Sequence, residues 1–203
     1  MRIKGFYFIT DRNLSKKDNI EDVKAAIKGG ARIVQYREKE KTLIEFLAEV
    51  IEIKKICAEN NTTLIINDSV AACLLANADG VHLGQDDMPL EDARRVLGKH
   101  RIIGITVHNV EEALLAEKQG ADYLGVSPIY ETKTKKDAGK PAGLGLLREI
   151  KKKTRLPCVA IGGINERNVD EVIKAGADAW AAISATVAKE DAEKAVKFFT
   201  TKS

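Results

Sequence analysis

Charged and amide side chains gather in three short stretches whose residue types could hold a phosphorylated ligand. The stretch VQYREK places Gln35, Arg37 and Lys39 at alternate positions, so a strand there would aim all three to one side. Two further stretches contribute carboxylates, Asp68 in IINDS and Asp87 in GQDDMP. Two carboxylates, completed by phosphate oxygens and waters, are a usual way for proteins to hold Mg²⁺. The sequence therefore predicts an anion site beside a cation site.

Both parts of this prediction have a structural alternative. An Asp directly before a helix commonly serves as its N-cap, and a helix is expected to begin at Ser69 or Val70, next to Asp68. Charge at the end of a strand is also often only solvated surface. The residues themselves leave these alternatives open.

A second anion site is expected further along the chain, made of backbone groups rather than charged side chains. AIGGIN carries Gly162 and Gly163, and ISA carries Ile183 and Ser184. Bare amides at such turns bind phosphate well, here beside a helix that Asn165 is expected to cap. The Gly-Gly pair has a plainer alternative, which is turn geometry alone. One charged and one neutral anion site indicate two phosphorylated substrates, one of them a diphosphate.

The elements that must position these residues are short apolar strands that alternate with amphipathic helices. The strands are expected at 7–10, 32–37, 63–68, 80–84, 102–107, 123–128, 157–163 and 179–184. Their nearly continuous apolar character is typical of strands covered on both faces. Eight strand–helix units in 203 residues favour an α/β fold of the (β/α)8 TIM barrel type over an open doubly wound sheet. In such a barrel, functional residues lie at the carboxyl ends of the strands, where the stretches above fall.

A weak internal repeat supports the barrel. GGAR (29–32), NADG (77–80), QGAD (119–122) and AGAD (175–178) each precede an even-numbered strand, as helix-to-strand turns should. These turns lie at the opposite end of the barrel from the predicted sites. Their Asp residues are therefore expected to be structural.

Composition and charge disfavour several other classes of protein. The 33 basic and 30 acidic residues give a net charge of +3, which is too balanced for a nucleic-acid-binding surface. No apolar run reaches the roughly 20 residues that a membrane-spanning helix needs, and the start MRIKGFYFITDR is too charged for a signal peptide. We expect a cytoplasmic enzyme with one catalytic domain, residues 1–203, and leave a homo-oligomer open.

The cysteines and histidines are not arranged for metal binding. Cys57, Cys73 and Cys158 are odd in number, and each lies in an apolar segment, so buried reduced thiols are expected. His82 lies within a strand, and His108 at the end of another. Neither these two nor the remaining His100 suggests a three-histidine site.

Taken together, these motifs resemble those of the thiamine-phosphate synthase family. VQYREK, IINDS, GVHLGQDDMP, IGITVH, DYLGVSPIYETKTKKDAG, AIGGIN and ISA follow the motif order of that family and cover essentially the whole chain. The resemblance implies a barrel enzyme that joins 4-amino-5-hydroxymethyl-2-methylpyrimidine diphosphate to 4-methyl-5-(2-phosphoethyl)thiazole. Such a transferase releases thiamine phosphate and pyrophosphate.

The resemblance also implies roles for particular residues. Arg37, Lys39 and Lys135 are expected to be catalytic, and Asp68 and Asp87 are expected to bind one Mg²⁺ per subunit. The residues expected to contact the pyrimidine diphosphate are Gln35, Tyr36, Arg37, Glu38, Lys39, Asn67, Thr106 and Lys135. Those expected to contact the thiazole phosphate are Thr132, Lys133, Thr134, Gly163, Ile183 and Ser184. Thr106 stands where the family commonly has serine, which keeps the hydroxyl group.

Two alternatives use the same scaffold. A thiazole tautomerase-like isomerase, or a non-catalytic thiazole-phosphate binding protein, would share the thiazole phosphate site. The tautomerases tend to lose the Asn-Asp pair, the acid of the GQDD stretch and the Thr-x-Thr-Lys pattern. This chain retains all three, which favours the synthase.

Overall fold

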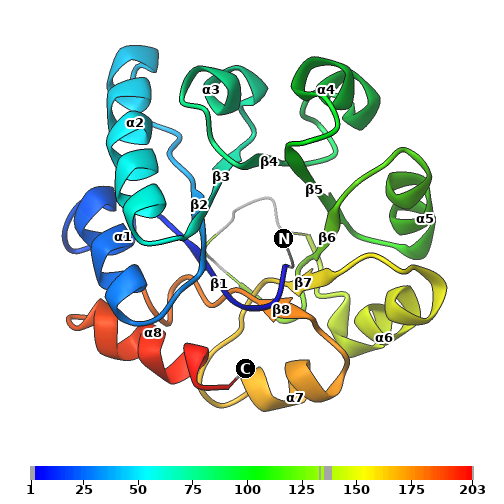
Figure 1. The fold of residues 1–203 in the computed structure, drawn as a ribbon. Coiled ribbons are helices and arrows are strands. Elements are labelled where there is room, and N and C mark those ends of the chain that lie inside the picture. The colour runs from blue at the N-terminus through cyan, green and yellow to red at the C-terminus, as the bar shows by residue number, and fades with distance from the viewer. Residues whose placement is uncertain (1–2, 133, 135–138, 203) are drawn as a thin grey trace.

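The computed structural model describes residues 3–132, 134 and 139–202, and they form a closed barrel of eight parallel strands surrounded by helices (Figure 1). The strands are β1 Gly5–Ile9, β2 Ile33–Tyr36, β3 Thr63–Asn67, β4 Gly80–Leu83, β5 Ile102–Val107, β6 Tyr123–Val126, β7 Cys158–Ala160 and β8 Ala179–Trp180. They pair in sequence order, and β8 closes the ring against β1. The predicted (β/α)8 fold is confirmed, and the open doubly wound sheet is wrong.

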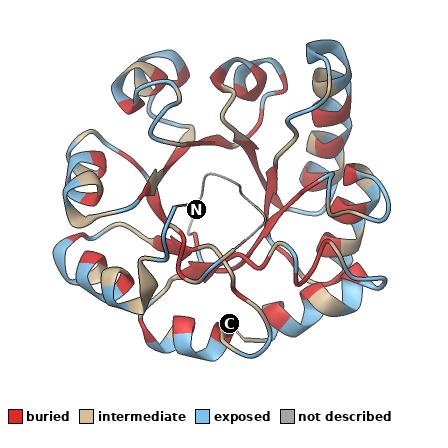
Figure 2. Ribbon diagram, turned by 180° about the vertical axis from the view of Figure 1, so that it is seen from behind, coloured by how far each residue is buried: buried red, intermediate tan, exposed pale blue. Residues whose placement is uncertain are grey.

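Each strand is followed by a helix. The helices are α1 Asn19–Lys28, α2 Leu43–Glu59, α3 Val70–Leu75, α4 Leu90–Leu97, α5 Val110–Lys118, α6 Gly143–Lys153, α7 Val169–Lys174 and α8 Ala192–Thr200. Each helix turns a buried face toward the strands and an exposed face outward (Figure 2). The helices cover the outer face of the barrel, so the strand side chains on that face are shielded from water. This explains the apolar character of the strands.

The hydrophobic core has two parts because strand side chains alternate between the two faces of the barrel. Phe8 and Val34 pack between the strands and the helices. Their neighbours Tyr7 and Ile33 point inward and pack with Tyr123 and other residues inside the ring. The barrel is therefore a filled core rather than a pore, and a ligand has room only at its ends.

Three aspartates at the amino-terminal end of the barrel repeat one structural device. Each follows a helix and precedes an even-numbered strand, and its carboxylate accepts from a backbone amide near the start of the preceding strand. It also forms an ion pair with a basic residue of an even-numbered helix. The three sets are Asp79 with Leu64 and Lys54, Asp122 with Ile103 and Arg94, and Asp178 with Cys158 and Lys151. The predicted structural role of these aspartates is confirmed.

Six of the eight expected strands are shorter in the structure, β7 and β8 by the most, and one expected helix begins later. β7 ends at Ala160, since Gly162 and Gly163 have φ angles of 101° and 65° and carry the chain out of the strand. The chain after β8 turns at Ile183, whose carbonyl accepts from the amides of Thr186 and Val187. The prediction that Asn165 caps a helix is wrong, because α7 begins only at Val169.

The remaining expectations about the chain as a whole concern membranes and thiols. Within the described ranges, no helix is both long and apolar enough to cross a membrane. Cys57, Cys73 and Cys158 are buried and unpaired, as expected. Burial raises the pKa of the Cys73 thiol to about 11, so this cysteine is a poor nucleophile near neutral pH.

Gly104 offers a test of the packing inside the barrel, because a Cβ there would collide with the Tyr123 ring. Gly104→Ala is expected to lower the free energy of unfolding by about 1–3 kcal/mol, the usual cost of overpacking a core. Gly145 in α6 is the matched control, since a Cβ there meets no atom within 4 Å. Urea unfolding measures both variants, and equal stability would contradict the described packing.

Candidate active site

The carboxyl ends of the strands surround a cavity of about 310 Å³, which lies within the range of small-molecule sites, roughly 300–1,000 Å³. Twelve of the predicted site residues line it: Gln35, Arg37, Lys39, Asn67, Asp68, Asp87, Thr106, Thr132, Thr134, Gly163, Ile183 and Ser184. Lys133 and Lys135 lie outside the described residues. The cavity therefore brings together residues from both predicted anion sites.

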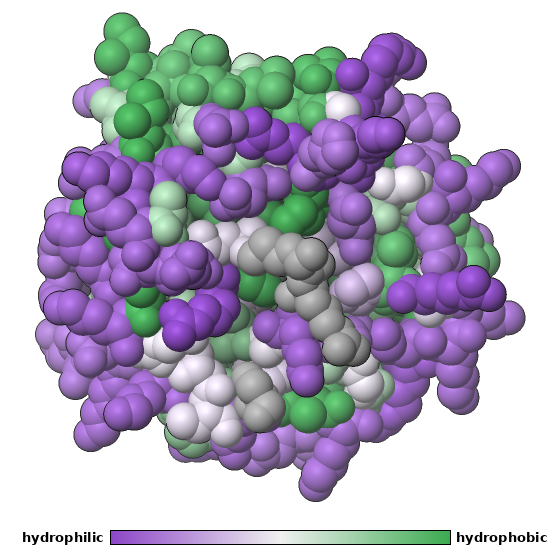
Figure 3. Space-filling view, in the orientation of Figure 1, coloured by the Kyte–Doolittle hydropathy of each residue, from purple (hydrophilic) through white to green (hydrophobic). Residues whose placement is uncertain are grey.

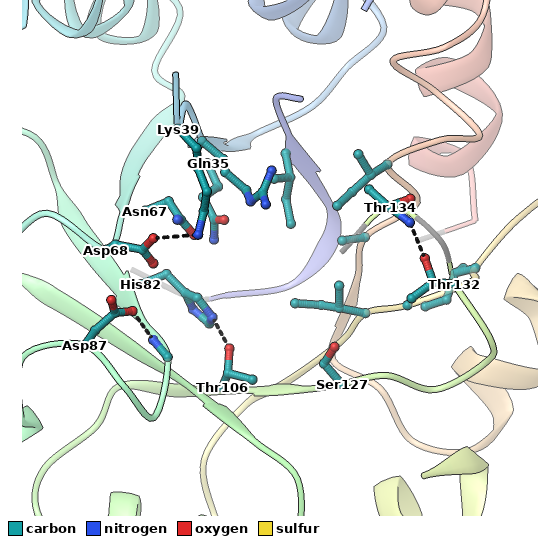
Figure 4. Close-up of a pocket in the computed structure, with 18 of the residues that line it drawn as sticks. Gln35, Lys39, Asn67, Asp68, His82, Asp87, Thr106, Ser127, Thr132 and Thr134 are labelled. Carbon is teal, nitrogen blue, oxygen red and sulfur yellow. Dashed lines mark hydrogen bonds and ion pairs between the residues drawn. The ribbon is translucent and has the colours of Figure 1, made fainter. Parts of the chain in front are cut away.

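The two predicted sites form opposite halves of the cavity (Figure 4). Lys39, Asp68 and Asp87 lie on one side, where β2, β3 and β4 end. Thr132 and Thr134 lie on the other side, in the segment after β6. The parallel barrel puts these distant parts of the chain around one space.

Arg37 reaches the cavity from the end of β2, and the end of β1 holds it in place. The Arg37 amide donates to Thr10 Oγ1 at 2.8 Å, and Thr10 Oγ1 donates to the Arg37 carbonyl at 3.0 Å. The guanidinium of Arg37 donates to Asp11 Oδ2 at 3.1 Å. Asp11 is buried, so the ion pair fixes the direction of the guanidinium more firmly than a surface pair would. This partnership was not predicted from the sequence.

Tyr36 and Glu38, which are also expected to contact the pyrimidine diphosphate, are not among the residues that line the cavity. The Tyr36 hydroxyl donates to the buried carboxylate of Glu49 in α2. Asn19 Nδ2 in α1 donates to Glu38 at 3.1 Å and to Glu49 at 2.9 Å. Burial would raise the pKa of Glu49, but hydrogen bonds from Lys41, Tyr36 and Asn19 outweigh it and lower that pKa. Since strand side chains alternate, these two residues anchor the segment after β2 from outside the barrel.

Asp68 and Asp87 face each other as predicted, and the alternative N-cap role of Asp68 is wrong. Ser69 caps α3 instead, and its side chain accepts from the amide of Ala72. Burial, followed by the neighbouring charge of Asp87, raises the pKa of Asp68, and Lys39 partly opposes this effect. Asp68 lies 3.4 Å from Lys39 Nζ, while Asp87 Oδ2 accepts from the Gly84 amide at 2.7 Å.

The two carboxylates suit a cation that also binds a ligand. No cluster of three or more Asp, Glu, His or Cys side chains able to hold a metal occurs in the part of the chain that the structure describes. Protein groups alone would therefore hold a cation weakly. The repulsion that raises the pKa of Asp68 is relieved by a positive charge between the carboxylates, and diphosphate oxygens can complete its coordination. The residues present thus fit Mg²⁺ bound together with a phosphorylated ligand.

The other half of the cavity presents backbone amides. Among the described residues, the amides of Gly163, Ile183 and Ser184 have no hydrogen-bond acceptor. Gly163 has a φ angle of 65°, and a Cβ there would lie 2.5 Å from the carbonyl oxygen of Glu131. Glycine is therefore required by the turn, and the same turn leaves donors available to an anion. Turn geometry and phosphate binding are compatible here rather than alternatives.

His82 and Ser127 were not among the residues predicted to line the cavity. Both line it, and Figure 4 shows His82 beside Thr106. His82 was considered only as a metal ligand. In the expected strand 80–84 the apolar Val81 and Leu83 hold the alternate positions, so His82 is expected on the opposite face of the strand from them.

Comparisons with known proteins decide which family this cavity belongs to. Residues 6–186 match the family described as thiamine monophosphate synthase. The chain belongs to the thiamine monophosphate synthase family. The thiamine-phosphate synthase of Methanosarcina barkeri is 50% identical over 194 residues, 96% of this chain and 88% of the relative. That of Methanosarcina mazei is also 50% identical over 194 residues, 96% of this chain and 80% of the relative.

A solved structure agrees with the family. Thiamine phosphate pyrophosphorylase from Pyrococcus furiosus has 40% sequence identity and a TM-score of 0.90, and the match covers 97% of this chain and 94% of the other. Thiamine-phosphate synthases are transferases that release pyrophosphate in thiamine biosynthesis, and they act on small phosphorylated substrates in a metal-assisted reaction. The family, fold and enzyme class predicted from the sequence are confirmed.

The raised pKa of Asp68 has a consequence for stability in the absence of metal. The folded protein binds this proton more tightly than the unfolded chain, so the stability that Asp68 contributes is lost as pH rises through its folded-state pKa. Asp87→Asn is expected to lower the pKa of Asp68 toward, but not to, its ordinary range, because burial remains. The metal-free variant should then be more stable than the parent protein at neutral pH.

Carbon-13 NMR of aspartate carboxyl groups measures this pKa, and chemical denaturation measures the stability. Asp86→Asn is the control, because Asp86 neighbours Asp87 but is not among the groups that shift the pKa of Asp68. An unchanged Asp68 pKa in Asp87→Asn would contradict the facing carboxylates.

Proposed function

We propose that the cavity joins 4-amino-5-hydroxymethyl-2-methylpyrimidine diphosphate to 4-methyl-5-(2-phosphoethyl)thiazole, giving thiamine phosphate and pyrophosphate. The observation that carries this proposal is the opposition of two different anion-binding halves in one cavity. Arg37, Lys39, Asn67, Asp68 and Asp87 suit a diphosphate with a divalent cation. The amides and hydroxyls of the other half suit the single phosphate of the thiazole: the residues are Thr132, Thr134, Gly163, Ile183 and Ser184.

The proposed reaction needs electrostatic stabilisation more than a base. The bond between the pyrimidine methylene carbon and the diphosphate oxygen breaks, and its electron pair leaves with the pyrophosphate. The amino group of the pyrimidine delocalises the resulting positive charge, and the thiazole nitrogen then donates its lone pair to form the new C–N bond. Arg37 and Lys39 stabilise the negative charge that grows on the leaving group. The cavity also holds the two reacting atoms in line, which lowers the entropic cost of their meeting.

A divalent cation would strengthen this stabilisation. Asp68 and Asp87 would hold Mg²⁺, one per subunit, which supplies positive charge to the departing pyrophosphate. Lys135 lies outside the described residues, and we propose from the family resemblance that it also contacts the diphosphate. Lys133 is proposed on the same ground beside the thiazole phosphate.

Release of pyrophosphate from the two precursors tests the proposed function. We expect release only when both precursors and Mg²⁺ are present, and we expect EDTA to abolish it. A thiazole tautomerase would convert its substrate with EDTA present and without the diphosphate. A non-catalytic binding protein would retain the thiazole phosphate and release no pyrophosphate. Either of these outcomes would overturn the proposal.

Substitution of the charged residues tests their individual roles. Asp68→Ala and Lys135→Ala are each expected to lower turnover by on the order of 10²-fold or more while the fold survives. Asp92→Ala is the control, since Asp92 lies on α4 in an exposed ion pair with Arg95. Steady-state turnover at saturating substrates and Mg²⁺ measures the effect. Full activity in both Asp68→Ala and Lys135→Ala would remove the assigned roles.

The setting of the enzyme is also a proposal. We propose that residues 1–203 form one catalytic domain that works in the cytoplasm, without nucleic acid or membrane as a partner.

Exposed apolar side chains gather over α2 and α3 (Figure 3), among them Leu43, Ile44 and Leu75. Such patches often mark contacts between proteins, which supports a homo-oligomer. Sedimentation equilibrium that shows only monomer at micromolar concentrations would contradict it.

A further inference from the structure

A continuous chain of hydrogen bonds crosses the interior of the barrel and connects two residues of the cavity. Gln35 Nε2 donates to the Tyr7 hydroxyl at 3.0 Å, and the hydroxyls of Tyr7 and Tyr123 lie 2.7 Å apart. The Tyr123 hydroxyl is 2.9 Å from His82 Nδ1, and His82 Nε2 is 2.8 Å from Thr106 Oγ1 (Figure 4). Gln35 and Thr106 form its two ends, and both line the cavity.

Two glycines make room for the rings in this chain. A Cβ at Gly104 would collide with the Tyr123 ring, and a Cβ at Gly125 would lie 2.8 Å from His82 Cε1. The rings of His82 and Tyr123 stack with their centroids 5.4 Å apart. The interior is therefore packed around these polar rings, which leaves them little freedom to change partners.

Burial makes the direction of each hydrogen bond depend on the next. Tyr7 and Tyr123 are at most 1% exposed, and His82 is 5% exposed. Burial raises the pKa of both phenols, so each keeps its one proton. A buried hydroxyl proton without an acceptor is costly. The two phenols form hydrogen bonds with described residues only inside this series from Gln35 to Thr106. Each phenol therefore accepts on one side and donates on the other.

With a neutral His82 imidazole, only two arrangements of the protons satisfy this condition. In the first, Gln35 donates to Tyr7, Tyr7 to Tyr123, and Tyr123 to His82 Nδ1. His82 then carries its proton on Nε2 and donates to Thr106, so the Thr106 hydroxyl is left to donate into the cavity. In the second arrangement every hydrogen bond runs the other way. Thr106 donates to His82 Nε2, and His82 Nδ1 donates to Tyr123. Tyr123 then donates to Tyr7, and Tyr7 donates to Gln35.

The first arrangement is the one in the structure, since Nε2 of Gln35 faces Tyr7. The other amide atom of Gln35, Oε1, accepts no hydrogen bond from the described residues. It does not belong to the side-chain atoms that are both buried and without a partner, so it is not fully buried. It is therefore accessible from the cavity that Gln35 lines. The cavity thus presents an acceptor at Gln35 and a donor at Thr106, and the reversed arrangement would present the opposite pair.

We propose that the chain from Gln35 through Tyr7, Tyr123 and His82 to Thr106 is a relay that fixes this acceptor and donor pair for an aminopyrimidine edge. Such an edge has an amino group that donates and a ring nitrogen that accepts. The first arrangement pairs the amino group with Gln35 and the ring nitrogen with Thr106, whereas the second would pair them with the ring turned over. Tyr7, Tyr123 and His82 are then positioning residues for the pyrimidine. This inference rests on the proposed function for its ligand, but the coupling along the relay can be measured without any ligand.

Gln35→Glu tests the coupling directly, because an ionised carboxylate can only accept a hydrogen bond. It should reverse the relay and move the proton of His82 from Nε2 to Nδ1. Nitrogen-15 NMR of histidine side chains reports this tautomer in the ligand-free protein, measured above about pH 8, where the carboxylate is ionised. The double variant Gln35→Glu/Tyr7→Phe breaks the relay next to residue 35, so His82 should return to the Nε2–H form.

Two results would overturn the relay. The first is an unchanged His82 tautomer in Gln35→Glu. The second is a reversed tautomer that persists in the double variant, because it would show that the charge at residue 35 acts on His82 directly through space. Circular dichroism confirms that each variant is folded before the spectra are compared.

Kinetics test whether the relay serves pyrimidine recognition. Tyr123→Phe should raise the KM for the pyrimidine diphosphate about tenfold, the factor that corresponds to about one hydrogen bond, and leave the KM for the thiazole phosphate unchanged. Tyr130→Phe is the control, since it removes a tyrosine hydroxyl that bonds Glu171 outside the relay. Equal rises in both KM values would show a general structural effect and overturn the recognition role. If the parent protein releases no pyrophosphate, the proposed function fails, while the NMR test of the relay still stands.

Discussion

The parallel closure of eight strands around a filled interior is the constraint on which the rest of the structure depends. Because all strands run in one direction, every residue that follows a strand lies at the same end of the barrel. Because the interior is packed, those residues surround a cavity at that end instead of a channel. The opposite end carries the repeated aspartates that join turns, strands and helices. Stability and chemistry are therefore assigned to opposite ends of one barrel.

The distribution of charge around the cavity follows from this arrangement. β2, β3 and β4 deliver basic and acidic side chains to one half, where burial and the neighbouring Asp87 raise the pKa of Asp68. The segments after β6, β7 and β8 deliver hydroxyls and amides to the other half. A diphosphate leaving group needs strong charge stabilisation, whereas a phosphate that only anchors a substrate needs directional donors. The two halves differ in the way these two tasks require.

The sequence predicts the fold and most of the cavity because both follow from local patterns. Alternation in VQYREK correctly turned Gln35, Arg37 and Lys39 toward the cavity, and the same alternation could have excluded the side chains of Tyr36 and Glu38. One local prediction was wrong: Asn165 does not cap a helix, because α7 begins only at Val169. It could not find the relay, because Tyr7 and Tyr123 are 116 positions apart in the chain. Only the closed barrel brings their hydroxyls together.

We propose that one cavity binds the two phosphorylated groups in opposite halves. The most direct measurement is a crystal structure of the protein with thiamine phosphate, pyrophosphate and Mg²⁺. We expect pyrophosphate to bind against Arg37 and Lys39, with Mg²⁺ between Asp68 and Asp87. It predicts the phosphate of thiamine phosphate against the amides of Gly163 and Ser184. Pyrophosphate bound in the amide half, or a metal bound away from both aspartates, would contradict it.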